Sequence, residues 1–126
     1  MDIPIYRAKK IDSDEYVVGY YSNTAEFLGK ILRNKNGYIN SNGEFWIIDP
    51  STLAIHFPNM LDSEGNKIFA SLSYGKGGDI CKSVDKKRFK QEGVEDTVAI
   101  LLDGSVVIGE HYLTSKRFYL KVKGIQ

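Results

Sequence analysis

Residues 97–108 read TVAILLDGSVVI, two apolar runs separated by an Asp-Gly pair, and this stretch decides the fold class. Asp103 and Gly104 readily adopt the positive φ angles of a type I′ turn, and flanking apolar runs are typical of a β-hairpin. Turn-forming pairs recur between short runs of alternating character, and 12% of the residues are aromatic. The sequence therefore predicts a mainly β protein.

Turn-forming residues between apolar runs predict further strands along the chain. The expected strands are residues 3–10, 16–21, 44–48, 54–57, 68–69 and 118–123. A polar turn at residues 12–14 connects the strands at 3–10 and 16–21, and another at residues 62–67 leads from the strand at 54–57 to that at 68–69. Asp49-Pro50 ends the strand at residues 44–48. The last strand is expected at an edge of the sheet, because its lysines discourage further pairing.

Two segments have helical patterns. In residues 23–32, Asn23 and Glu26 have the spacing of a capping box, and Leu28, Ile31 and Leu32 share a helical face. A glycine within this segment costs the helix about 1 kcal/mol. Residues 84–92 form the second candidate, with a serine before them as N-cap and a glycine after them as terminator.

Length and composition exclude several classes of protein. The chain has 126 residues, with 42% hydrophobic and 26% charged side chains, which fits one globular domain with a real core. Its net charge of +1 gives no global attraction to nucleic acid or anionic lipid. One cysteine allows no internal disulfide, and neither a membrane span nor a signal peptide is evident. We expect a cytoplasmic protein.

No spacing in the sequence assembles a catalytic or metal site. His56 and His111 lie far apart and lack further ligands at metal-binding spacing, so each is expected to be an ordinary side chain of a β domain. Cys81 has no base near it in sequence and is expected in the core. Residues 74–79, YGKGGD, carry a lysine among glycines but do not match a phosphate-binding loop. We therefore expect no catalytic residues, metal or cofactor.

A basic segment at residues 82–90 supports an alternative function. Residues 76–126 carry 10 basic and 7 acidic side chains, against 7 and 9 in residues 1–75. In the alternative, phosphates of a nucleic acid would contact Lys86, Lys87, Arg88, Lys90, Lys116 and Arg117. If residues 84–92 are helical, the simplest arrangement instead places Phe89 in the core and the basic side chains in water.

Three blocks of the chain resemble the YopX-like proteins of phages and prophages. Residues 6–12, YRAKKID, and 15–21, EYVVGYY, resemble the opening of that family. Residues 48–53, IDPSTL, and 61–69, LDSEGNKIF, resemble two further family motifs, and Gly78-Asp79-Ile80 stands where the family has Gly-Asp-Ile. The matched motif residues are Arg7, Gly19, Asp49, Pro50, Asp62, Gly65, Gly78 and Asp79.

The resemblance covers residues 5–81 and implies a phage or prophage origin, a cytoplasmic host setting and self-association, without catalytic residues. Two departures accompany it. Residues 54–60, AIHFPNM, replace a glycine-bearing family stretch, and residues 70–77 are an insertion before the Gly-Asp-Ile motif. The matched residues also suit structural roles, since Asp49-Pro50 and residues 62–65 have turn chemistry and Gly19 suits a bulge or close packing.

The predicted fold is a single mainly β domain over residues 1–126, built of antiparallel hairpins that form a barrel or a strongly bent sheet, with one or two short helices. It combines the family-like blocks at residues 5–81 with a C-terminal hairpin and last strand at residues 97–123. The side chains expected to be mostly buried are Tyr16, Val18, Tyr20, Phe45, Ile47, Ile68, Val98, Ile100 and Val107. Residues 70–78, rich in glycine and serine, are expected to form an exposed, poorly packed loop.

The function expected from the sequence is that of a non-enzymatic phage accessory protein. It would act through protein contacts with phage or host proteins and as a homo-oligomer. Unpaired strand edges motivate the self-association, because a small sheet either shields such edges or pairs them across a symmetry axis.

Overall fold

The computed structural model describes residues 4–72, 76–83, 95–109, 111–112 and 120–126, and it confirms the mainly β prediction. Its elements are β1 (Ile5–Lys9), β2 (Tyr16–Phe27), β3 (Lys30–Ser41), β4 (Glu44–Ile47), the 3-10 turn η1 (Pro50–Thr52), β5 (Ala54–His56), β6 (Ala70–Leu72), β7 (Asp79–Ser83), β8 (Glu95–Ile100), β9 (Val106–Ile108), β10 (His111–Tyr112) and β11 (Leu120–Ile125). No helix in these ranges is long and apolar enough to cross a membrane.

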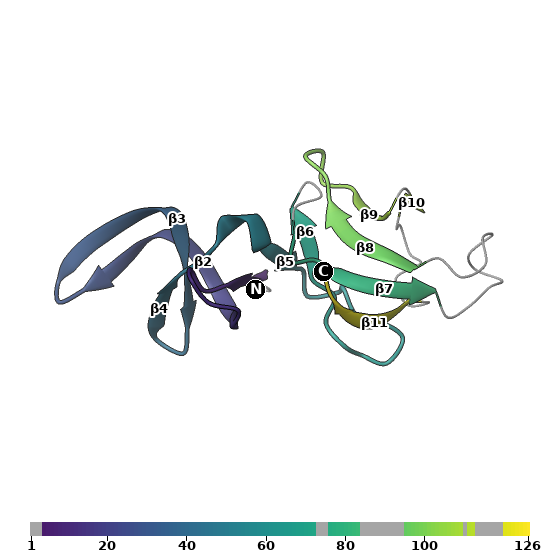
Figure 1. Cartoon of the computed structure of the whole chain (residues 1–126), viewed down its shortest axis with the longest axis horizontal. Helices are drawn as coiled ribbons and strands as arrows, with labels where there is room; N and C mark the ends of the chain where they lie inside the picture. Colours follow the sequence, from purple (N-terminus) through teal and green to yellow (C-terminus); the bar gives the residue numbers. More distant parts are fainter. Residues whose placement is uncertain (1–3, 73–75, 84–94, 110, 113–119) are drawn as a thin grey trace.

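The strands form one strongly curled, open sheet, a half-barrel (Figure 1). Its order is β10-β9-β8-β6-β5-β1-β2-β3-β4, and β7 joins from β8 with β11 on its other side. The β6–β8 pair is parallel, whereas the other pairs are antiparallel. The bent sheet predicted from the sequence is therefore confirmed.

Backbone contacts join the two ends of the β1–β4 part of the sheet. Lys10 and Ile48 form an isolated antiparallel bridge, so the end of β4 returns to the end of β1. The Ile11 N–H donates to the Ile47 carbonyl at 2.9 Å, and the Asp49 N–H donates to the Lys9 carbonyl at 2.8 Å. These bonds bend β1 to β4 around a core of their own.

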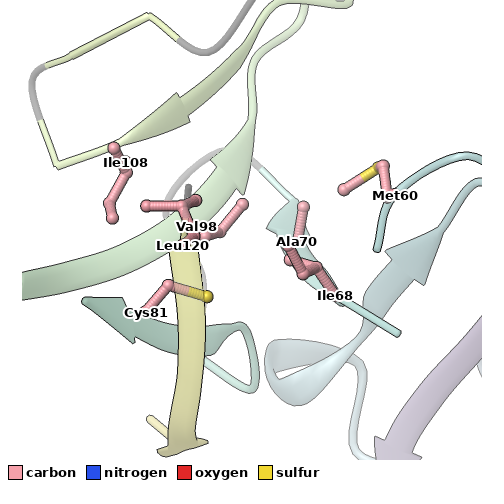
Figure 2. Packing of buried hydrophobic residues seen from close by; sticks show 7 residues of the cluster. All are labelled: Met60, Ile68, Ala70, Cys81, Val98, Ile108 and Leu120. Atoms are coloured by element: carbon pink, nitrogen blue, oxygen red, sulfur yellow. The ribbon is translucent and has the colours of Figure 1, made fainter. Parts of the chain in front are cut away.

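Two separate hydrophobic cores support the sheet. The first lies between β1 and β4 and contains Ala8, Val17, Ile39, Ile48 and Leu53. The second gathers side chains from the rest of the sheet, and Figure 2 shows its members: Met60, Ile68, Ala70, Cys81, Val98, Ile108 and Leu120. Each core thus belongs to one end of the curled sheet, and β1 and β5 pair between them.

The helix predicted over residues 23–32 is wrong, because this stretch is the hairpin of β2 and β3. Leu28 and Gly29 have φ angles of 52° and 75°, which reverse the chain in two residues. Thr24 lies opposite Arg33 and Phe27 opposite Lys30, so the backbone bonds pair across strands. The second predicted helix, residues 84–92, lies outside the described residues. In the described ranges the helical content is the single turn η1.

The burial predictions are confirmed in part. Ile68, Val98 and Val107 are buried, and Tyr16, Ile47 and Ile100 are half-buried. The predictions for Val18, Tyr20 and Phe45 are wrong, since these side chains are 42%, 56% and 38% exposed. In β2 the alternation of a strand turns Val17 toward the core, and Val18 therefore faces outward.

The hairpin of β8 and β9 is confirmed, but its turn is not of type I′. Asp103 does not have a positive φ angle, whereas Gly104 has φ +88° and donates its N–H to the Leu101 carbonyl at 2.9 Å. Three residues therefore make the loop, with glycine in the left-handed position. Of the last predicted strand, residues 120–123 belong to β11, which pairs with β7 on one side within the described chain. Residues 118 and 119 lie outside the described part.

The prediction that residues 70–78 form an exposed, poorly packed loop is wrong for most of the described residues, although Leu72 and Lys76 are exposed. Ala70 and Ser71 belong to β6 and are fully buried. The Lys76 N–H donates to the Ser51 carbonyl at 2.9 Å, and Gly77 and Gly78 are buried. A Cβ atom on Gly77 would lie 2.0 Å from the Thr52 carbonyl oxygen. The glycines therefore serve close packing. Residues 73–75 lie outside the described part.

Candidate functional site

Two of the family-matched residues, Arg7 and Asp79, meet between the two cores. Their side chains form a salt bridge of 2.7 Å between Nη2 of Arg7 and Oδ1 of Asp79. The same Nη2 donates to the Gly77 carbonyl at 2.8 Å, and the other oxygen of Asp79 accepts from the Phe69 N–H at 2.8 Å. The guanidinium carbon also lies 4.4 Å from the centre of the Phe69 ring. The pair is built into the interior.

The electrostatics of this pair fit a structural role. Burial raises the pKa of Asp79, and the charge of Arg7 and the hydrogen bond from Phe69 oppose that rise. Arg7 is 8% and Asp79 is 1% exposed, so neither presents a surface to a ligand. The Nε atom of Arg7 is buried without a hydrogen-bond partner in the described structure. The Nη2 bonds and the ring contact nevertheless hold the guanidinium in place.

His56 lies next to this pair and is also buried. Its Nδ1 atom is 3.0 Å from the Ile68 carbonyl oxygen, and because a carbonyl only accepts, Nδ1 carries the proton and donates. Burial lowers the pKa of His56, which keeps the ring neutral. The side chain of His111 lies outside the described part. In the described ranges no group of three His, Cys, Asp or Glu residues could hold a metal ion.

The other family-matched residues shape turns and close contacts. Asp49 caps η1 by accepting from the Ser51 N–H at 3.0 Å, and Pro50 starts that turn. Asp62 accepts from the N–H groups of Asn66 and Val122, and these bonds hold its pKa below the usual value although burial opposes them.

Three glycines complete the family-matched set. Gly65 has φ +83° in the turn that Asp62 organises. A Cβ atom on Gly19 would lie 2.0 Å from the Asn40 carbonyl oxygen, and one on Gly78 would lie 2.6 Å from the Val98 carbonyl oxygen. Both positions therefore require glycine.

The remaining sequence candidates offer no reactive group in the described structure. Cys81 is fully buried, and burial raises the pKa of its thiol to about 12, far from that of a nucleophilic cysteine. The six residues of the nucleic-acid alternative, Lys86, Lys87, Arg88, Lys90, Lys116 and Arg117, all lie outside the described residues.

The feature that sequence reasoning missed is a projecting hairpin, residues 24–33, which we call the arm. Figure 1 shows the β2–β3 hairpin extending away from the rest of the molecule. Four large apolar side chains on it are exposed: Phe27 64%, Leu28 85%, Ile31 74% and Leu32 45%. The helical spacing of the apolar residues suggested a core-facing helix, and the clue to a hairpin was the Leu28-Gly29 pair at its centre.

Both edges of the arm are unpaired in the described structure. On the β2 edge, the residues that pair with β1 extend no further toward the arm than Gly19. On the β3 edge, pairing with β4 begins only at Tyr38, which lies beyond the arm. A register shift between Ser22 and Thr24 separates the arm from the paired base of the hairpin. The arm is therefore a two-stranded ribbon with free backbone groups on both sides.

A groove of about 470 Å³ lies between the arm and β4. Its lining residues are Ala25, Glu26, Phe27, Leu32, Tyr38, Gly43, Glu44, Phe45, Trp46 and Ile47. Ala25 lies opposite Leu32 in the arm, and Phe27 follows on the same face, so these three form one wall. The groove is apolar, with two carboxylates as its charged groups.

The charges of this region have no partner within the described chain. Glu26 and Glu44 line the groove, while Lys30 and Arg33 lie on the second strand of the arm. None of the four forms a salt bridge in the parts of the chain that the structure describes. The arm thus presents apolar side chains and unpaired cations beside an apolar groove with unpaired anions. No known protein family, curated protein or solved structure compared with this chain matches it.

Proposed function

We propose that this protein is non-enzymatic and acts through protein contacts, including self-association, with the arm and the adjacent groove as its contact surface. The observation that carries the proposal is the exposure of Phe27, Leu28 and Ile31 on a hairpin that packs against neither core. Contiguous apolar surface of this kind marks interaction sites on proteins that are otherwise polar outside.

The size of the patch supports the proposal. With about 200 Å² for a large apolar side chain when fully exposed, the four apolar residues of the arm expose on the order of 500 to 550 Å². That is within the range of about 300 to 600 Å² found for the largest patch on a typical monomer, which is often functional. A two-stranded hairpin is also marginally stable alone in water, so a partner would stabilise it.

The non-enzymatic part of the proposal rests on where the perturbed titratable groups lie. His56, Asp79 and Cys81 are each buried and packed against protein atoms, and Asp62 and Asp103 are bound in turns, whereas the described lining of the groove contains neither a histidine nor a cysteine. The resemblance to YopX-like proteins supports the same proposal and adds a phage or prophage origin with a cytoplasmic host setting.

Light scattering after size-exclusion chromatography tests the proposal over a range of protein concentrations. We expect a mass that rises above 14.2 kDa with concentration. The double variant Leu28→Ser/Ile31→Thr should elute at the monomer mass, because it removes the two most exposed apolar side chains of the arm. The matched control is Leu102→Ser, at the tip of the β8–β9 hairpin, where the side chain is 98% exposed. A mass of 14.2 kDa for the unmodified protein at every concentration would refute self-association.

A further inference from the structure

We infer that the partner of the arm is a second copy of this chain, and that the two copies insert their arms into each other's grooves. This inference rests on the proposed self-association and specifies its geometry. Leu28 and Ile31 of one copy would enter the groove of the other, with Lys30 and Arg33 placed against Glu26 and Glu44.

The lining of the groove determines which chemistry it accepts. Its walls include Phe27, Leu32 and Trp46, so an occupant must bring apolar side chains. Among the lining residues that the structure describes, Glu26 and Glu44 are the charged ones, and none is a lysine or an arginine. A binding segment that carries a cation beside its apolar side chains would therefore pair with the groove carboxylates, while an acidic segment would be repelled.

The arm carries that combination in a short stretch. Leu28 and Ile31 are its two most exposed apolar residues, with Lys30 between them and Arg33 two residues further on. Leu102 instead precedes Asp103, Ile11 lies between Lys10 and Asp12, and Ile125, two residues after Lys123, is only 39% exposed. Among these exposed sites, the arm is thus the one that combines two strongly exposed apolar side chains with two nearby cations.

Position favours a reciprocal arrangement. The arm forms one wall of the groove, so an arm that enters a second copy brings its own groove close to that copy's arm. A two-fold axis makes the two contacts identical, as in most homodimers. The apolar residues of the arm, which include two of the groove-lining residues, expose on the order of 500 Å², more than half of the roughly 800 Å² per partner that a stable interface buries.

Charge reversal with mixing tests the inference. Glu44→Lys in one protein and Lys30→Glu/Arg33→Glu in another should each weaken self-association by about tenfold to a hundredfold, because like charges then face each other. Mixing the two variants should restore a dimer that contains one copy of each. Lys67→Glu, in the polar turn at residues 62–67, is the control and should associate like the unmodified protein.

Trp46 provides a second readout, because it is the single tryptophan of the chain and lines the groove. Dilution of the unmodified protein should shift its emission to longer wavelength as the groove opens to water, and each charge-reversal variant should show that emission from the start. If the unmodified protein self-associates but the reversals change nothing, or if mixing restores no dimer, arm exchange is refuted while self-association stands. A monomer at every concentration refutes both.

Discussion

Arg7 in β1 and Asp79 in β7 form a buried salt bridge of 2.7 Å across 72 positions of sequence. Ala8, next to Arg7, belongs to the core between β1 and β4, and Cys81, two residues after Asp79, belongs to the other core. The salt bridge therefore lies where the two ends of the curled sheet meet. Its loss should affect the stability of the whole chain.

Substitution of either partner should be strongly destabilising. Arg7→Met or Asp79→Asn leaves one buried charge without its counterion, which typically costs about 3 to 5 kcal/mol of unfolding free energy. The control is Asp14→Ala, which removes an exposed ion pair with Lys9 at 3.9 Å and should cost less than about 1 kcal/mol. Urea unfolding followed by Trp46 fluorescence measures both. Equal losses in the buried and exposed variants would contradict the structural role.

His56 should make the protein less stable below neutral pH. Burial lowers its folded pKa below 6.5, so the unfolded chain binds a proton that the folded chain does not between those two values. Unfolding free energy should therefore fall as the pH drops through 6.5 toward the folded pKa, with a slope of at most about 1.4 kcal/mol per pH unit.

The variant His56→Gln keeps a donor toward the Ile68 carbonyl but does not titrate. The difference between the pH profiles of the two proteins isolates the histidine from nearby Lys67 and Asp79. Parallel profiles between pH 5 and 7.5 would show that His56 is not buried as a neutral ring.

Two glycines with similar positive φ angles should respond differently to alanine. Gly77 has φ +93° and its missing Cβ atom would lie 2.0 Å from the Thr52 carbonyl, so Gly77→Ala adds a backbone clash to the conformational strain. We expect a loss of about 3 kcal/mol or more. Gly65 has φ +83° and open space around it, so Gly65→Ala should cost about 1 to 2 kcal/mol. Thermal unfolding compares them, and a Gly77 variant as stable as the Gly65 variant would mean that residues 76–78 are not packed.

The nucleic-acid alternative has a direct test in its dependence on salt. Because we propose protein contacts, we expect no binding of short single- or double-stranded oligonucleotides in fluorescence titrations at low and at moderate salt. If the basic segment binds phosphates, affinity must fall by about 0.7 to 0.9 log units per tenfold salt for each phosphate neutralised. Lys86→Ala/Lys87→Ala should then reduce that slope, whereas Lys9→Ala on β1 should not.

Local turn chemistry allowed much of the strand content to be predicted from the sequence. Asn42 and Gly43 have φ angles of 53° and 86°, and Gly104 has φ +88°, so these reversals depend on residues that tolerate the left-handed region. Strands on both sides of such turns pair because they are neighbours in sequence. Such local pairs can be inferred without knowledge of the rest of the fold.

Pairings between distant residues could not be predicted in this way. The parallel contact of Ser71 with Ala99 and the salt bridge of Arg7 with Asp79 depend on how the sheet curls, which no local pattern encodes. The resemblance singled out Arg7 and Asp79 separately, without indicating that they pair. The burial of individual side chains also depends on the curl, because the curl of the sheet decides which face of β2 meets a core.

The sequence by itself determined a β-rich chain with a hairpin at its Asp-Gly pair, since a turn needs only the conformational freedom of its own residues. Tertiary structure decided that residues 24–33 are an arm rather than a helix. Apolar residues spaced at three and four positions suit a helix only if that face can pack on a core, and neither core receives Leu28 or Ile31. Without that packing, the left-handed pair Leu28-Gly29 and cross-strand hydrogen bonds hold the segment as a hairpin, and its apolar side chains remain exposed.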